Sequence, residues 1–467
     1  MGHLTRGMST FAVTNPQTGE VEETFDSLTE EQLKQVIDQA DAAYQDWSQK
    51  SWAERGEVLT RFAEIFEARQ EELADIVGHE MGKPKPQTIA EIKKVAATAR
   101  WYAENSEQFL APTELQPSDG VRTFVKHDPI GVLLSIMPWN FPYNQLARFA
   151  LPNLMVGNTI MMKQAAICPR SSQALADALE EAGAPKGVYT NVYMNSSDTE
   201  AVLSDFRVKG FSLTGSEAAG SAVAKIAAKH LKRSVLELGG NDPLIVLDAD
   251  DVAALARKAV SLRLANAGQV CTSPKRFIVV EEIYDEFLAA AKEAVENTKV
   301  GDYDAEGIDM GPLSSESARD EILASVQQAV ADGATLHCGG EKLDRPGWFM
   351  SPALISDAPL DSAMGCQEMF GPVVNVFRAK DEEDAIRIAN ATPYGLMGSV
   401  WSTDLERAQR VGERVQVGML QINAHMESGP EFPFGGVNLS GYGREGAQWA
   451  LREFTNEKTF RVHDQEL

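Results

Sequence analysis

Three side chains in separate segments have the chemistry for attack on a carbonyl carbon. Cys271 follows a glycine-containing turn in NAGQVCTS, and a thiol displayed on a loop becomes a nucleophile when its pKa is lowered. Glu237 ends an apolar run, where burial would raise its pKa toward that of a general base. Asn140 lies in the proline-braced turn MPWNFPY, whose amide could donate to an oxyanion. Taken singly, each residue type is also common in inert positions, so both interpretations stay open.

A fourth segment, FSLTGSEAAG at residues 211–220, is typical of a strand, a glycine turn and a helix start. Backbone N–H groups at Gly215 and Ser216 could hold a phosphate there, although the spacing is not GxGxxG. The literal GxGxxG match begins at Gly441, without a clear preceding strand, and only 21 residues follow Gly446. A βαβ unit does not fit in that space, so we reject this match as a dinucleotide fingerprint.

The elements that must position these residues alternate from about residue 130. GVLLSIMP, TIMMK, GVYTNVYM and VKGFSLTG predict strands, and residues 145–155 and 169–182 predict helices between them. This order indicates a parallel sheet covered by helices on both faces. A capping box at Thr29 opens a helix to Trp47, and residues 53–81 predict a second helical segment. A second α/β set begins near DPLIVLDAD and runs to about Phe434, which predicts a cleft between the two sets.

Composition excludes several classes of function. The 467 residues favour two or three domains, and the net charge of −25 argues against binding to nucleic acid or an acidic membrane. The four cysteines form no CxxC pair, so we expect no zinc site, no disulfide framework and no other metal, and a reducing cytoplasmic setting. The N-terminal segment lacks the apolar core of a signal peptide.

The order of the motifs resembles the aldehyde dehydrogenase superfamily from about Val13 to Phe454. The resemblance is carried by PWNFP, the strand ending in Lys163, FSLTGS, LELGGNDP, GQVC, EMFGPV and PFGGVNLSGYGRE. It implies an α/β fold with a Rossmann-like cofactor domain at 8–109 and 129–238 and an α/β catalytic domain at 239–436. It also implies a β-strand oligomerisation arm at 110–128 and 450–467, and a homodimer or homotetramer.

The same resemblance implies a role for each matched residue. Cys271 would attack a small-molecule aldehyde, and Asn140, with the Cys271 N–H, would stabilise the oxyanion. Glu237 would activate the water that hydrolyses the thioester. The cofactor would be NADP or NAD, and the residues implied to bind it are Trp139, Lys163, Ala166, Gly215, Ser216, Gly220, Glu368 and Phe370.

Two departures from the family pattern carry predictions. Many NAD-preferring relatives have a glutamate three residues after the lysine, where this chain has Ala166. No carboxylate there repels a 2′-phosphate, so we expect NADP to be accepted, and preferred over NAD. Ser273 stands where some relatives have a second cysteine, so a disulfide with Cys271 is not available.

Within the superfamily, the chain most resembles the shorter bacterial succinate-semialdehyde dehydrogenases. Arg148 and Ser428 match positions that bind the substrate carboxylate there, although a helix arginine can equally be a solvated one. Another arginine found close before the nucleophile in some members is absent; Ala265 occupies its place and Arg263 is displaced. We therefore expect oxidation of succinate semialdehyde to succinate. The alternatives are another small aliphatic aldehyde or semialdehyde, a redox-inactive cysteine hydrolase using His425, and a binding protein that lost activity.

Overall fold

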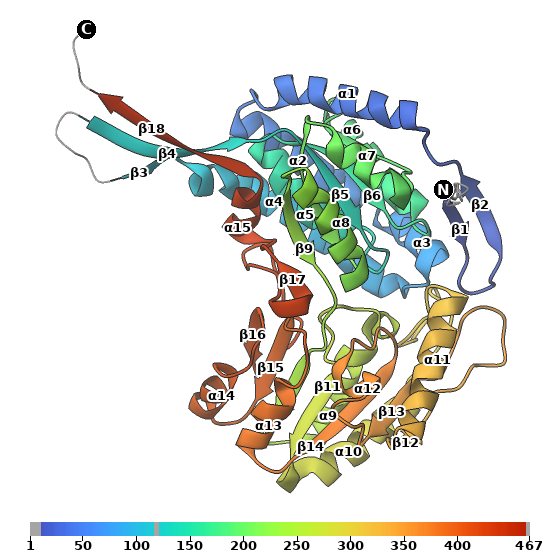
Figure 1. Cartoon of the computed structure of the whole chain (residues 1–467). Coiled ribbons are helices and arrows are strands. Elements are labelled where there is room, and N and C mark those ends of the chain that lie inside the picture. The colour runs from blue at the N-terminus through green and yellow to red at the C-terminus, as the bar shows by residue number, and fades with distance from the viewer. Residues whose placement is uncertain (1–10, 116–120, 464–467) are drawn as a thin grey trace, which may run out of the picture.

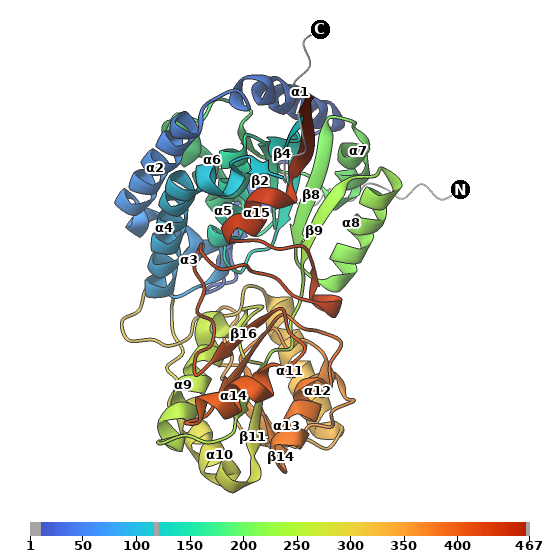
Figure 2. The ribbon, with the colours of Figure 1, turned by 90° about the vertical axis from the view of Figure 1, so that its left-hand side faces the viewer.

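The computed structural model describes residues 11–115 and 121–463. Two α/β bodies lie one above the other, and a narrow β-sheet projects from the upper body (Figures 1 and 2). Each body is built on its own mostly parallel sheet. The α/β fold class predicted from the sequence is confirmed.

The upper sheet has six strands in the order β17-β9-β8-β5-β6-β7. All neighbours pair in parallel except β17. The strands are β5 (Val132–Met137), β6 (Thr159–Gln164), β7 (Tyr189–Asn191), β8 (Val208–Thr214), β9 (Arg233–Glu237) and β17 (Gly441–Tyr442). The helices of this body are α1 (Glu30–Trp47), α2 (Trp52–Ala68), α3 (Gln70–Met81), α4 (Lys85–Leu110), α5 (Asn144–Val156), α6 (Pro169–Glu181), α7 (Thr199–Ser204), α8 (Glu217–Lys229) and α15 (Ala447–Glu453).

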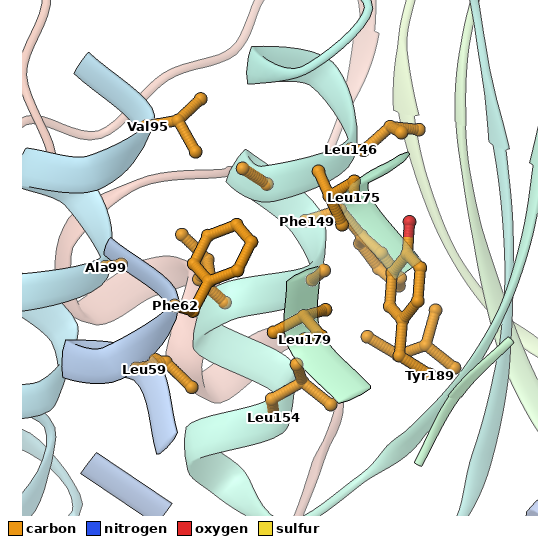
Figure 3. Close-up of a cluster of buried hydrophobic side chains, with 14 of the residues drawn as sticks. Leu59, Phe62, Val95, Ala99, Leu146, Phe149, Leu154, Leu175, Leu179 and Tyr189 are labelled. Atoms are coloured by element: carbon orange, nitrogen blue, oxygen red, sulfur yellow. The ribbon is translucent and has the colours of Figure 1, made fainter. Parts of the chain in front are cut away.

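Alternation along the strands buries both faces of this sheet. Leu133 of β5 packs in a cluster with α2, α4, α5 and α6, whereas its neighbours Val132 and Leu134 pack in another with α1, α7 and α8. Figure 3 shows part of the first cluster, where Phe62 of α2 lies between α4 and α5. Helices therefore cover both faces, as the sequence pattern predicts.

Three sequence predictions can be compared with these elements. The capping box is confirmed, because Gln32 N donates to Thr29 Oγ1 at 3.2 Å and Thr29 N donates to Gln32 Oε1 at 2.8 Å. The single helical segment at 53–81 is wrong: the helix breaks at Arg69, whose φ and ψ of −103° and 16° leave the helical region. The strand expected in GVYTNVYM is reduced to three residues at the sheet edge, where β7 pairs with β6 alone.

The lower sheet has seven strands in the order β12-β13-β14-β11-β10-β15-β16, parallel except for β12. The strands are β10 (Pro243–Val246), β11 (Arg276–Val280), β12 (Thr335–Cys338), β13 (Ala353–Ser356), β14 (Val373–Ala379), β15 (Met397–Trp401) and β16 (Met419–Ile422). The helices are α9 (Val252–Leu264), α10 (Glu281–Glu296), α11 (Glu316–Ala331), α12 (Ala363–Cys366), α13 (Glu382–Ala389) and α14 (Leu405–Gly412).

The projecting sheet joins distant parts of the chain. Its strands are β3 (Thr113–Glu114), β4 (Val121–Pro129) and β18 (Thr455–His463), with β4 in the middle and antiparallel to both neighbours. A hairpin of β1 (Phe11–Thr14) and β2 (Val21–Phe25) lies at the other side of the upper body (Figure 1). The domain boundaries stay predictions, and of these residues 8–10, 116–120 and 464–467 lie outside the described part. No helix in the described residues is long and apolar enough to cross a membrane.

Candidate active site

The carboxyl ends of neighbouring parallel strands bring the predicted residues to one edge of the upper sheet. Met137, which ends β5, pairs with Gln164 of β6, and Thr214 of β8 pairs with Glu237 of β9. The chain builds outward from β5 to β6 and β7 on one side and to β8 and β9 on the other. Such a switch in strand order opens a crevice at the carboxyl edge, the usual ligand site of open α/β sheets.

The cysteine lies on a loop of unusual backbone after α9. Asn266 and Ala267 have φ of 50° and 54°, and Gly268 follows at 71°. A side chain at Gly268 would place its Cβ 2.2 Å from the Gly371 carbonyl oxygen, so the loop requires glycine there. The turn reverses the chain and brings Cys271 to the mouth of the crevice.

Arg263 holds this loop from beneath. Its fully buried guanidinium donates to the carbonyl of Gly268 at 3.2 Å and to Ser273 Oγ at 2.6 Å. It also donates to the carbonyls of Met369 and Gly371, both at 2.6 Å. Arg263 therefore joins the cysteine loop to the following segment and is not directed at a substrate.

Asn140 is tied to the same loop. Its Nδ2 donates to the Gln269 carbonyl at 3.0 Å, and Asn266 Nδ2 donates to the Asn140 carbonyl at 2.9 Å. Asn140 and Cys271 line one cavity of about 290 Å³, here called the Trp139 cavity. The amide and the thiol therefore face a common space, as a nucleophile and an oxyanion donor must.

Glu237 is a buried carboxyl in an unusual electrostatic state. Its side chain is 2% exposed, and within the described residues neither carboxyl oxygen has a hydrogen-bond partner. Burial raises its pKa well above the usual value, and the Glu445 carboxylate raises it further, while Arg148 and Arg444 oppose this. A buried carboxyl with a raised pKa is suited to taking a proton near neutral pH.

Burial also acts on Cys271. It raises the pKa of the thiol to about 11, against the opposing charges of Lys275 and Arg148. Lys275 Nζ donates to the Val270 carbonyl at 2.9 Å and to the Cys271 carbonyl, and lies 3.4 Å from Glu368 Oε1. Sequence reasoning missed this lysine; the available signal was a single cation four residues after the cysteine, directly before a buried strand.

The Trp139 cavity has features that fit a dinucleotide. Ser216 caps α8, its Oγ accepting from Ala219 N at 3.3 Å, so the helix N-terminus opens toward the cavity. Trp139 and Phe370 form an edge-to-face pair with ring centroids 5.8 Å apart. The predicted residues that line the cavity are Trp139, Asn140, Gly215, Ser216, Cys271, Glu368 and Phe370. A phosphate-binding helix end, aromatic walls and a carboxylate suit a nicotinamide cofactor.

Three predicted cofactor residues lie outside that lining. Lys163 is largely buried at the end of β6, and Ala166 follows it, its carbonyl accepting from Ala12 N at 3.0 Å. Gly220 lies in the first turn of α8, where an added Cβ would come within 2.6 Å of Leu238 Cδ2. The glycine therefore allows close packing of the helix, and the binding roles of these three residues stay predictions.

A second cavity, of about 440 Å³, is lined by the first two turns of α5 and is here called the Arg148 cavity. Asn144 and Arg148 line it from α5, whereas Gln145 between them lines the Trp139 cavity. Ser428 lines the opposite wall of this cavity, from the loop that contains Glu427 to Pro430. The structure thus brings the two predicted substrate residues to one cavity. It also adds Lys94 of α4, which the sequence reading missed, donating from Nζ to Ser428 Oγ.

His425 is bonded at both ring nitrogens. Nε2 lies 3.0 Å from the Thr272 carbonyl and therefore donates, while Nδ1 lies 2.7 Å from Ser399 Oγ. Burial lowers the pKa of this histidine to about 4, so the ring is neutral. Neither nitrogen is left to activate Cys271, which counts against a cysteine hydrolase.

Comparison with known proteins agrees with this geometry. Residues 4–460 match the aldehyde dehydrogenase family. The chain belongs to that family. It is 43% identical over 97% of its length to the succinate-semialdehyde dehydrogenase [NADP(+)] of Deinococcus radiodurans, of which 94% is covered. The enzyme of the same name from Mycobacterium avium is 42% identical, with 96% of each chain covered.

A solved structure is similar over the whole fold. The succinic semialdehyde dehydrogenase of Streptococcus pyogenes, in complex with NADP+, superposes with a TM-score of 0.94 at 38% identity, covering 97% of this chain and 100% of that one. This aldehyde dehydrogenase therefore shares its architecture with an enzyme whose structure was solved with its cofactor bound. Its two cavities are both lined by residues of the start of α5, and Cys271 lines the Trp139 cavity.

Proposed function

We propose that this aldehyde dehydrogenase oxidises succinate semialdehyde to succinate, with NADP+ as the preferred cofactor. The observation that carries the proposal is the Arg148 cavity, which is lined from the start of α5, as is the Trp139 cavity that holds Cys271, and combines apolar walls with cationic and hydroxyl groups. A four-carbon aldehyde with a distal carboxylate has the matching chemistry. The names of the bacterial relatives support the same substrate.

The residues of this chain divide the reaction between them. The Cys271 thiolate attacks the aldehyde carbon, and Asn140 Nδ2 donates to the oxygen that becomes negative. The hydride that the adduct must lose would pass to a bound NADP+, which Ser216, Glu368 and Phe370 would hold in the Trp139 cavity. Glu237 then takes a proton from the water that attacks the thioester, releasing the acid and the Cys271 sulfur.

The preference for NADP+ rests on the surroundings of Lys163. Burial alone lowers its pKa, and among residues 11–115 and 121–463 no carboxylate pairs with its Nζ. Ala166, three residues on, adds no negative charge. A phosphate placed here would meet an uncompensated cation, whereas the 2′-hydroxyl of NAD+ would gain much less.

Steady-state kinetics test both parts. We expect kcat/KM for succinate semialdehyde to exceed that for butanal and propanal by at least about tenfold, a difference of roughly 1.4 kcal/mol. NADPH formation at 340 nm supplies the measurement, repeated with NAD+. Equal values for the charged and neutral aldehydes would refute the substrate, and a large preference for NAD+ would refute the cofactor.

The proposal also covers the assembly of the protein and its location in the cell. The β3-β4-β18 sheet projects away from both bodies (Figure 1), and its β18 edge is free to extend a sheet in a second copy. This supports a homodimer or homotetramer. All four cysteines are free thiols, which supports the reducing cytoplasm.

A further inference from the structure

The turn that presents Asn140 leads into α5, and the first amides of that helix need an acceptor from outside it. The helix begins at Asn144, directly after PWNFPY. Its N-cap residue, Tyr143, points its side chain elsewhere, donating from the hydroxyl to the Leu73 carbonyl at 3.0 Å. Free N–H groups at the start of a helix are costly when they are buried, so another residue must accept from them.

Glu91 of α4 supplies that acceptor. Its Oε1 accepts from Tyr143 N at 2.9 Å and from Asn144 N at 2.8 Å. Its other oxygen, Oε2, accepts from Lys83 Nζ at 2.6 Å, and both side chains of this ion pair are 1% exposed. A carboxylate is favoured at the positive end of a helix, and hydrogen bonds to it are stronger than those to a neutral group.

Lys83 also contacts the turn directly. Its Nζ lies 3.7 Å from the centroid of the Phe141 ring, and Phe141 follows Asn140 in the chain. Burial lowers the pKa of Lys83, and the charge of Glu91 opposes this. The ammonium and the carboxylate therefore support each other, and together they hold the turn at Phe141 and at the two amides that open α5.

Asn140 depends on such support because its amide has one donor to spare. A side-chain amide has two N–H groups, and Nδ2 already donates to the Gln269 carbonyl at 3.0 Å. The remaining N–H is the one that can reach an oxyanion, so its direction is fixed by the turn. A displacement of about 1 Å at such a group can cost roughly 100-fold in rate.

The neighbouring helix α6 shows what the lysine adds. Glu80 of α3 caps α6 in the same way, accepting from Arg170 N at 2.5 Å and from Ser171 N at 3.2 Å. Burial raises the pKa of Glu80 to about 8, and within the described residues no cation forms an ion pair with it. Of these two buried caps, the one with its own ammonium is the one that opens the helix after Asn140.

We propose that Lys83 and Glu91 are positioning residues for the oxyanion donor: they fix the start of α5 so that the Asn140 amide faces Cys271. This rests on the proposed role of Asn140. Among the described residues that line the Trp139 and Arg148 cavities, neither Lys83 nor Glu91 appears. The pair therefore acts on the rate of thioester formation for any aldehyde and leaves the choice between aldehydes unchanged.

Rapid mixing of Glu91→Gln with butanal and with succinate semialdehyde tests this. The amide cannot accept from both the helix amides and Lys83, so the rate of the NADPH burst should fall about 30-fold for both aldehydes. Binding of NADP+, followed by tryptophan fluorescence, should change less than about threefold and shows that the variant is folded. Glu107→Gln, at an exposed position of α4, is the matched control and should change neither. An unchanged burst rate, or a loss for one aldehyde alone, would overturn the proposal.

A second substitution should rescue the first. In Lys83→Met/Glu91→Gln no unpaired charge remains, and the amide oxygen is free to accept from the start of α5. We therefore expect the burst rate to recover to within about fivefold of the wild type, whereas Lys83→Met alone should slow it at least about tenfold. Lys93→Met, at an exposed position of α4, should have no effect alone and should rescue nothing. A double variant slower than both single variants would overturn the proposal.

A double-mutant cycle with Asn140→Ala separates positioning from general damage to the fold. If Glu91 acts through Asn140, Glu91→Gln should slow the burst less than about threefold further once the amide is gone. Losses that multiply would overturn the positioning role. If Asn140→Ala alone leaves the burst unchanged, the proposed role of Asn140 falls together with it; if Asn140→Ala slows the burst and Glu91→Gln does not, only the positioning role falls. Glu91→Asp keeps the charge but withdraws the carboxylate by one methylene, so it should slow the burst roughly tenfold and serves in the cycle if Glu91→Gln does not fold.

Discussion

Arg148 and Glu445 form a buried ion pair that connects the Arg148 cavity to the carboxyl of Glu237. The side chains are 14% and 4% exposed, and Arg148 Nε donates to Glu445 Oε2. At Glu237 the two charges act in opposite directions: Glu445 raises its pKa and Arg148 lowers it. Burial is the largest cause of the raised pKa of Glu237, and the pair modifies that pKa as well as shaping a cavity wall.

This pair changes what Arg148→Ala should do. From the sequence alone, we expect the substitution to lower kcat/KM for succinate semialdehyde and to affect butanal far less. Since it also leaves Glu445 buried and unpaired beside Glu237, we expect kcat/KM to fall by about 2 kcal/mol or more for both succinate semialdehyde and butanal. Parallel kinetics with the two aldehydes measure this. A loss confined to succinate semialdehyde would mean that Arg148 acts on the substrate carboxylate alone.

Glu237→Gln should separate the two halves of the reaction. An amide of the same shape cannot take a proton from water, so hydrolysis of the thioester should slow by about 100-fold or more while acylation remains. Rapid mixing should show a burst of NADPH close to one per active site, then a slow steady state. In the wild type, the steady rate should rise with pH, because burial raises the pKa of Glu237 and only the deprotonated carboxylate can act as the base. Loss of the burst with an unchanged late rate would contradict the assignment.

Ala166→Glu should exchange cofactor preference. A carboxylate three residues after Lys163 would compete for its ammonium and repel a 2′-phosphate, so kcat/KM for NADP+ should fall at least about tenfold with little loss for NAD+. Lys163→Met is the matched variant, and it should also lower kcat/KM for NADP+ more than kcat/KM for NAD+. If Ala166→Glu leaves use of NADP+ unchanged, the 2′-phosphate does not lie near this position.

The strand ends of the upper sheet were predictable because their signals are local. Alternation and turn residues place Asn140, Gly215 and Glu237 after strands, and parallel strands must bring those ends to one edge. The break at Arg69 was not predictable, since its apolar pattern continues from one helix into the next. Helical periodicity indicates a buried face but does not mark a change of axis that packing imposes.

The roles of residues that depend on a partner far away in the chain could not be predicted from the sequence. Lys94 lies more than 300 positions from Ser428 along the chain, and nothing beside it in α4 marks it as different from Lys93. The sequence assigned no role to Arg263, and only the structure shows its guanidinium donating to the Gly268 carbonyl and to Ser273 Oγ of the cysteine loop. Such roles follow from tertiary geometry alone.

Arg263→Met should destabilise the fold as well as the site. The guanidinium satisfies the carbonyls of Gly268, Met369, Gly371 and Val373, and each buried carbonyl left unpaired costs about 1–3 kcal/mol. We expect the free energy of unfolding to fall by about 3 kcal/mol or more in urea titrations. Arg257→Met, on the exposed face of the same helix, provides the control and should change it by less than about 0.5 kcal/mol. Similar stability in the two variants would exclude the proposed support of the cysteine loop.

The ionisation of Cys271 offers the most direct test of the site's electrostatics. Burial raises its thiol pKa to about 11 and the nearby Lys275 charge opposes that rise. Only the thiolate reacts with iodoacetamide, so in the cofactor-free enzyme alkylation of Cys271 should accelerate about tenfold per pH unit between pH 7 and 9. Lys275→Met removes the nearest opposing charge, so it should raise the pKa and slow alkylation at each pH in that range. Lys292→Met, a substitution of a solvent-facing lysine on α10, should leave the profile unchanged.

The modified cysteine is identified by mass spectrometry, with Cys271→Ala giving the background of the other three thiols. That Cys271→Ala enzyme should also lack dehydrogenase turnover while still binding NADP+. An alkylation rate that is already independent of pH near 7 would show that the thiol is ionised there. The charge of Lys275 would then stabilise the thiolate more than burial destabilises it, which would contradict the raised pKa.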